Sequence, residues 1–230
     1  MAERLAQLRR VASQIRHPWR LEVDGLDRLP EDALILAVNR VGPTDHLNVA
    51  ASLGRPTTVV IQPESGLRPI PRLRRTSWTT DLDSLDHPAA VLARGQVLVV
   101  FPEVAAGNDG AVHKGHAEFA ALAVARRTPI VPAALVPITR TDPGIELRYR
   151  LRIGEPIGVN RFADLAETSD TTDGLILRGL TDLVMTNISQ LAGRRYRDDY
   201  TVGRSGLARN PASAARAEQS RQSRVERRVA

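Results

Sequence analysis

The chain lacks cysteine and a long apolar run. Without cysteine among its 230 residues, disulfide bonds and thiolate metal ligands are excluded. No run of 18 apolar residues occurs, so a membrane-spanning helix is not expected. The N-terminus has neither the continuous apolar segment nor the small-residue cleavage site of a secretory signal. These absences are typical of a protein of the reducing cytosol.

Lysine and aromatic residues are scarce. Lys114 is the only lysine, and Phe, Trp and Tyr together make up 3% of the chain. Proteins that bind single-stranded nucleic acid use aromatic side chains as stacking platforms, so this composition disfavours that class. No glycine-rich loop with the spacing of a P-loop or of a dinucleotide-binding turn occurs. Nucleotide-dependent chemistry is therefore not indicated.

The net charge of +6 lies at the two ends of the chain. Residues 1–20 carry +4 and residues 204–230 carry +5, which leaves −3 between them. Basic ends favour contact with an anionic partner, such as lipid headgroups or nucleic acid. We divide the chain into a basic amphipathic helix at 1–18, an α/β domain at 19–202 and an Arg-rich disordered tail at 203–230. The first helix either packs on the domain or lies in a membrane interface.

Short apolar runs alternate with amphipathic segments along the domain. We predict strands at 19–23, 33–38, 57–61, 76–80, 96–101, 129–136 and 145–153. We predict helices at 44–53, 84–94, 117–126 and 173–191, with Gly54 and Gly95 ending the first two. This alternation is typical of the α/β class. The expected architecture is a single-domain mixed, mostly parallel sheet flanked by helices, with antiparallel strands added late.

Two details of this pattern lead to further expectations. Pro132 interrupts an apolar strand, and because proline has no N–H, a bend or a sheet edge is expected there. The helix at 173–191 is amphipathic. Its inward side chains are predicted to be Leu177, Leu180, Leu183, Val184, Ile188 and Leu191.

Polar stretches follow two of the predicted strands. Residues 38–46 read Val-Asn-Arg-Val-Gly-Pro-Thr-Asp-His, and residues 99–103 read Val-Val-Phe-Pro-Glu. Ligands of α/β sheets bind beyond the carboxyl ends of the strands, so we expect the chemistry at these two stretches.

The order of the motifs resembles the glycerophosphate and lysophosphatidate acyltransferases, the PlsC-like family. Asn39-Arg40-x4-Asp45 is similar to the Asn-His-x4-Asp of that family, and Phe101-Pro102-Glu103 is similar to its Phe-Pro-Glu-Gly-Thr-Arg. The later matching segments are His113-Lys114-Gly115-His116, Pro129-Ile130-Val131-Pro132, residues 152–157, residues 180–185 and residues 196–200. The resemblance covers about residues 20–200.

The resemblance implies transfer of an acyl group to a lysophospholipid hydroxyl, without a cofactor. The donor would be a thioester of coenzyme A or of acyl carrier protein. In such a site a His takes the hydroxyl proton and an Asp orients that His. The resemblance also implies partners, namely an anionic membrane surface and an acyl carrier protein, and a cytoplasmic or peripheral place on the inner face of the plasma membrane. The substrate-binding residues it implies are Phe101, Pro102, Glu103, Lys114, Gly115 and His116.

Two departures fall in the motifs that carry the chemistry. Arg40 occupies the position of the catalytic His, and a guanidinium with a pKa above ~12 cannot accept a proton. Val104-Ala105-Ala106 replaces the Gly-Thr-Arg. Asp45 is retained and is expected to form an ion pair with Arg40. His46 is a surrogate base only if the loop changes register, because adjacent helical residues point about 100° apart.

Three functions remain as hypotheses. The first is an acyltransferase with impaired or altered chemistry, and the second is a non-catalytic lipid-binding or regulatory protein at the membrane surface. The third is a nucleic-acid binder that uses the basic tail, which the scarcity of aromatics disfavours. His113 and His116 have a metal-like i, i+3 spacing, but no cysteine or acidic partner completes a ligand set, so no metal site is expected.

Overall fold

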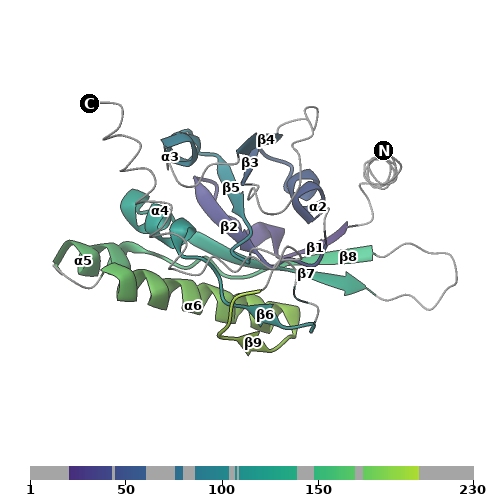
Figure 1. The fold of residues 1–230 in the computed structure, drawn as a ribbon. Coiled ribbons are helices and arrows are strands. Elements are labelled where there is room, and N and C mark those ends of the chain that lie inside the picture. Colours follow the sequence, from purple (N-terminus) through teal and green to yellow (C-terminus); the bar gives the residue numbers. More distant parts are fainter. Residues whose placement is uncertain are drawn as a thin grey trace, which may run out of the picture.

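The computed structural model describes residues 21–42, 45–60, 76–79, 86–103, 107, 109–138, 148–168 and 173–201. Its main strands are β1 Leu21–Asp24, β2 Leu34–Val38, β3 Thr57–Val60, β4 Thr76–Thr79, β5 Val97–Val100, β7 Ile130–Ile138 and β8 Arg148–Ile153. They form one sheet in the order β1-β8-β7-β2-β5-β3-β4 (Figure 1). Neighbouring strands are parallel except for β7 and β8. The predicted α/β class with a mixed, mostly parallel sheet is confirmed.

Helices lie on both sides of this sheet (Figure 1). They are α2 Asp45–Ser52, α3 Asp86–Ala93, α4 Glu118–Arg126, α5 Asn160–Thr168 and α6 Asp173–Ala192, with a 3-10 turn η2 at Leu26–Arg28. A second, two-stranded sheet of β6 Val112–His113 and β9 Tyr196–Arg197 adjoins α6. Within the described ranges no helix is long and apolar enough to cross a bilayer. The predicted helix at 1–18 and tail at 203–230 lie outside those ranges.

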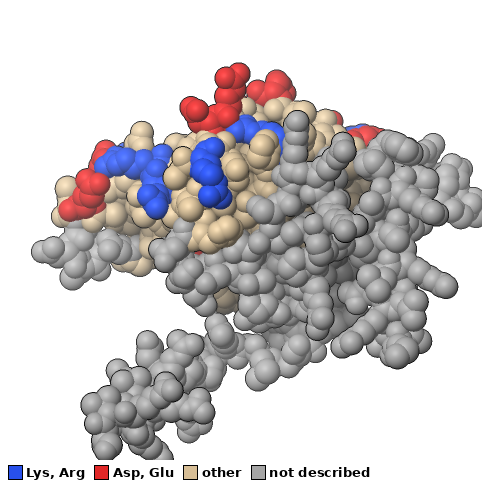
Figure 2. Space-filling view, turned by 90° about the horizontal axis from the view of Figure 1, so that it is seen from above, with Lys and Arg blue, Asp and Glu red and all other residues tan. Residues whose placement is uncertain are grey.

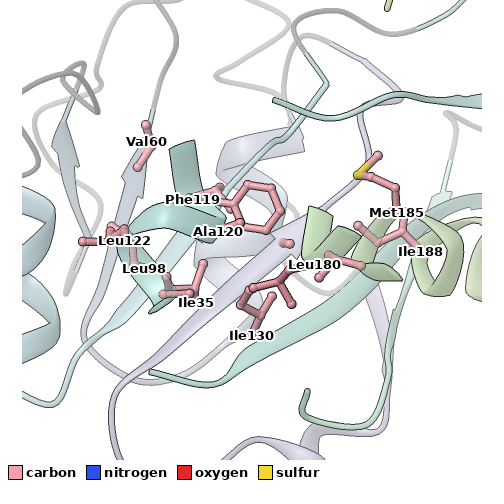
Figure 3. Packing of buried hydrophobic residues seen from close by; sticks show 14 of the residues in the cluster. Ile35, Val60, Leu98, Phe119, Ala120, Leu122, Ile130, Leu180, Met185 and Ile188 are labelled. Carbon is pink, nitrogen blue, oxygen red and sulfur yellow. The ribbon is translucent and has the colours of Figure 1, made fainter. Parts of the chain in front are cut away.

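Strand alternation divides the core into two clusters. Successive strand residues point to opposite faces of a sheet. Ile35 and Leu98 belong to the cluster that contains Phe119 of α4 and Leu180 of α6 (Figure 3). The opposite cluster contains other residues of the same two strands, together with Val49, Ala50 and Leu53 in and just after α2. Therefore α2, which follows the first polar stretch, packs on the face opposite to α4 and α6.

Pro132 does not mark the sheet edge that its sequence suggested. It lies in β7, between β2 and β8, and is in register with Ala37. Its carbonyl accepts a hydrogen bond of 2.8 Å from the N–H of Gly154, one residue beyond β8. The N–H and C=O of a strand residue point to the same side, and the Pro132 carbonyl points toward β8. An N–H at position 132 would therefore point to the place where the pairing with β8 ends. An interior proline is tolerated at that place.

The predicted buried stripe of α6 is correct except at Leu183. Leu180, Val184 and Ile188 are fully buried, whereas Leu183 is 42% exposed. The buried residues recur every four positions and define a line along the helix. Leu183 lies about 100° around the helix from Val184, which places it outside this line.

Candidate functional site

Asn39 extends the pairing of β2 with β7 by one step. Its Oδ1 accepts a 2.7 Å hydrogen bond from the Leu135 N–H, and its Nδ2 donates to the Leu135 carbonyl at 3.3 Å. The residue is fully buried. The Asn39 amide thus replaces the backbone groups of a further strand residue in pairing with Leu135. It fixes the end of β2, directly before Arg40.

Replacing Asn39 with alanine is expected to lower the free energy of unfolding by about 2–4 kcal/mol, because both backbone groups of Leu135 would stay buried without partners. Urea unfolding followed by circular dichroism measures the loss. Asn187→Ala is a matched control, since the Asn187 amide makes only a local bond to Leu183 within α6. Equal losses in the two variants would contradict the role assigned to Asn39.

Arg40, which the sequence predicts at the position of the family His, is buried. It is 9% exposed, and the central carbon of its guanidinium lies 5.1 Å from the centroid of the Phe101 ring. Its Nε has no hydrogen-bond partner among the described residues. Burial lowers the pKa of the guanidinium, while the charges of Asp45 and Glu103 act in the opposite direction. Phe101, predicted to bind substrate, thus lies beneath this cation.

Glu103 connects the two polar stretches. Its Oε2 accepts from the Arg40 backbone N–H at 2.9 Å, and its Oε1 accepts from the His113 backbone N–H at 2.8 Å. The residue is 1% exposed. Burial raises the pKa of the carboxyl, and the two backbone bonds oppose this rise. In this structure both oxygens of the predicted substrate contact bind backbone, so Glu103 holds the two stretches together.

Asp45 is the first residue of α2 and is directed back to the preceding turn. Its Oδ2 accepts hydrogen bonds from the N–H groups of Val41 at 2.6 Å and Gly42 at 2.8 Å. Its Oδ1 is buried without a partner among the described residues. Burial raises the pKa of Asp45 to about 6, although the two backbone bonds and the charge of Arg40 lower it. The expected ion pair with Arg40 is wrong, because Oδ2 binds the turn instead and the two charges interact only at a distance.

His46 is buried beside Asp45 and is the candidate surrogate base. Burial lowers its pKa to about 4, and the charge of Arg40 adds to this effect. The imidazole is therefore neutral at pH 7. The adjacent Asp45 carboxylate binds backbone N–H groups through Oδ2, and its Oδ1 has no partner among the described residues.

Tyr149 of β8 belongs to the same site and was not predicted. A Cβ built on Gly42 would lie 3.7 Å from the Tyr149 hydroxyl and 3.7 Å from Asp45 Oδ1. Burial and the negative charge of Asp45 raise the pKa of Tyr149. Alternation along β8 puts Tyr149 on the same face as Leu151 and Ile153. That alternation could have predicted the sheet face on which Tyr149 lies, but not that Tyr149 lies near Asp45.

The segment Lys114-Gly115-His116 packs behind the second polar stretch. The His116 N–H donates to the Pro102 carbonyl at 3.0 Å. A Cβ built on Gly115 would lie 2.8 Å from the Pro102 Cβ and 2.9 Å from the Met185 Sδ. Glycine is therefore required at position 115 for this close approach.

Residues 196–200, which we call the C-terminal strap, are bound to that segment. The Lys114 Nζ lies 2.5 Å from Asp198 Oδ1, and the rings of His116 and Tyr200 are 4.9 Å apart. The His113 nitrogens lie 2.8 Å from Asp199 and 2.9 Å from Asp109. Burial lowers the pKa of His113, but these carboxylates outweigh it and the net change is a rise. Lys114 would have to leave Asp198 to meet a ligand anion.

The predicted residues thus form two groups. Arg40, Asp45 and His46 interact electrostatically and are joined by Tyr149. Gly115 packs on Pro102, and its neighbours Lys114 and His116 contact the strap. Residues 43–44 and 104–106 lie outside the described ranges. Within those ranges, no set of three His, Asp or Glu side chains is arranged to hold a metal ion.

The described surface does not explain the predicted attraction to anionic lipid. In Figure 2, acidic and basic side chains are intermixed on the described part of one face. The basic excess lies in residues 1–20 and 204–230, which the structure does not describe. Contact with an anionic membrane therefore stays a prediction.

A comparison with solved structures finds the same fold. The 1-acyl-sn-glycerophosphate (LPA) acyltransferase PlsC from Thermotoga maritima matches with a TM-score of 0.51 and 18% identity, over 77% of this chain and 74% of that chain. No protein-family model and no curated protein matches. At this identity the likeness demonstrates the fold alone.

Proposed function

We propose that this protein binds lysophospholipid-type and acyl-thioester ligands on an acyltransferase scaffold, with impaired or altered acyl transfer. The observation that carries the proposal is the burial of Arg40, a cation that the motif order assigns to the position of the base. The fold shared with an LPA acyltransferase supports the scaffold. The motif order of the sequence supports the ligand class.

The usual chemistry of such a site needs a neutral imidazole bonded to the aspartate. Arg40 cannot accept a proton, and Oδ2 of the Asp45 carboxylate is bonded to the backbone N–H groups of Val41 and Gly42. Loss of a positioned general base reduces the rate by about 10²–10⁴. Transfer by the usual route is therefore slow, while the features that bind ligand need not be lost.

A non-catalytic role at the membrane surface is the second candidate. The same buried Arg40 favours it, because a protein that only binds or presents a lipid needs no base. The basic segments at 1–18 and 203–230 would attract an anionic bilayer. Pelleting with anionic vesicles that is lost when residues 1–18 are removed would support this role.

The test of the proposal is a transfer assay beside a binding assay. The purified full chain is mixed with lysophosphatidate and with either acyl-CoA or acyl carrier protein thioester. We expect binding of both ligands, with transfer at least ~100-fold slower than that of the Thermotoga PlsC measured in parallel. Equal rates would refute impaired transfer. Absence of both binding and transfer would refute the ligand class.

A further inference from the structure

Two buried polar atoms in the site lack partners, and they are complementary. Arg40 Nε is a donor and Asp45 Oδ1 is an acceptor, and neither has a hydrogen bond to a described residue. Leaving such a group unpaired costs about 1–3 kcal/mol. Asp45 accepts a 2.6 Å bond from the N–H of Val41, the residue after Arg40, and the charges of the two side chains act on each other. Arg40 Nε and Asp45 Oδ1 nevertheless do not bond directly. A hydroxyl group, which both accepts and donates, satisfies both atoms.

We infer that Arg40 and Asp45 hold the acceptor hydroxyl between them, and that residual acyl transfer uses Asp45 Oδ1 as the proton acceptor. The inference rests on the proposed function and names the chemistry of that same site. Arg40 donates to the hydroxyl oxygen and Asp45 Oδ1 accepts its hydrogen. Asp45 can do so without moving, because its other oxygen is fixed by Val41 and Gly42.

The reaction balances with the acyl thioester as co-reactant. The O–H bond of the acceptor breaks and its proton moves to Asp45 Oδ1. The oxygen attacks the thioester carbonyl carbon, so a C–O bond forms and the C–S bond breaks. The thiolate leaves and takes the proton from Asp45, which regenerates the carboxylate. Arg40 stabilises the negative charge that develops on the acceptor oxygen as its proton leaves.

The surroundings favour Asp45 over His46 as the base. The charged and titratable groups around the Asp45 carboxylate are Arg40, Tyr149 and the adjacent His46, and the charge of Glu103 acts on Arg40. With a pKa of about 6 against about 4, the carboxylate holds a proton more strongly than the imidazole. A base whose pKa lies near the working pH is the more effective one.

The experiment measures residual transfer from acyl-CoA to lysophosphatidate by the full chain. Asp45→Asn keeps an acceptor for the turn but cannot take a proton, and is expected to reduce the residual rate about 10²-fold. Asp164→Asn is the matched control, because Asp164 is an exposed carboxylate on α5 that pairs with Arg127. Its rate should stay within about twofold of the wild type. In the wild type, kcat/KM is expected to rise with pH through a limb near pH 6.

Several outcomes would overturn the inference. They are a rate unchanged in Asp45→Asn, a loss confined to His46→Gln, or no wild-type transfer while Arg40→His is active. If Asp45→Asn does not fold, the wild-type pH profile decides, and a flat profile between pH 5 and 7 counts against Asp45. Failure of the proposed function looks different, because then neither ligand binds and Arg40→His transfers nothing.

Discussion

Replacing Arg40 with histidine is expected to raise acyl transfer to lysophosphatidate by about 10²-fold or more. The change removes a buried donor that lacks a partner and supplies a group able to accept the proton. Asp45 Oδ1, which has no partner among the described residues, can then orient the imidazole and stabilise its charged form, as in a Ser-His-Asp arrangement. The measurement is kcat/KM with acyl-CoA for wild type and variant.

Arg40→Lys separates the gain of a base from the loss of a large side chain. Lysine keeps a cation at the same place, and we expect no comparable rise. Changing residues 104–106 to Gly-Thr-Arg in the Arg40→His variant should raise the rate further, because it adds a guanidinium for a ligand phosphate. A similar rise in Arg40→Lys, or none in Arg40→His with binding intact, would show that position 40 does not limit the reaction.

Asp45 and His46 are expected to change the stability of the protein with pH in opposite directions. The pKa of Asp45 is raised to about 6, so the folded state holds this proton more tightly than the unfolded state does. Its contribution to stability therefore falls as the pH rises from about 4 to 6. The pKa of His46 is lowered to about 4. Its contribution is therefore lost as the pH falls from about 6.5 to 4.

In the wild type the opposite contributions of Asp45 and His46 to the pH dependence of stability nearly cancel. Each variant removes one of them and so reveals the other. Between pH 7 and pH 4, Asp45→Asn is expected to lose about 2–3 kcal/mol of unfolding free energy relative to the wild type, and His46→Gln to gain about as much. Urea unfolding at the two pH values measures both, with Asp164→Asn as an exposed control. Changes of the same sign in the two site variants would contradict the burial assigned to them.

The sequence predicts the strands of the site and the loops that follow them. Continuous apolar runs locate β2 and β5, and the polar residues after them include Arg40, Asp45 and Glu103. Sequence spacing does not predict which atoms bond. Oδ2 of Asp45 binds two backbone N–H groups instead of Arg40, which depends on the shape of one turn.

Contacts between distant segments were also beyond the sequence. Lys114 pairs with Asp198, 84 positions along the chain, and Tyr149 approaches Asp45 from another strand. No local sequence pattern predicts either pair, because each contact depends on how the sheet and α6 bring distant segments together. The short strands β6 and β9 were missed for the same reason, since two residues carry no periodicity.

The contacts of the strap fix the position of residues 196–200 on the domain. Tyr200 packs on His116, whose neighbouring Gly115 contacts Pro102 in the second polar stretch. The basic tail follows only a few residues later, so its point of attachment is the same end of the sheet where Arg40 and Asp45 lie. If the basic tail binds a lipid surface or a carrier protein, as proposed, tethering alone would hold that ligand near Arg40 and Asp45 at a high local concentration.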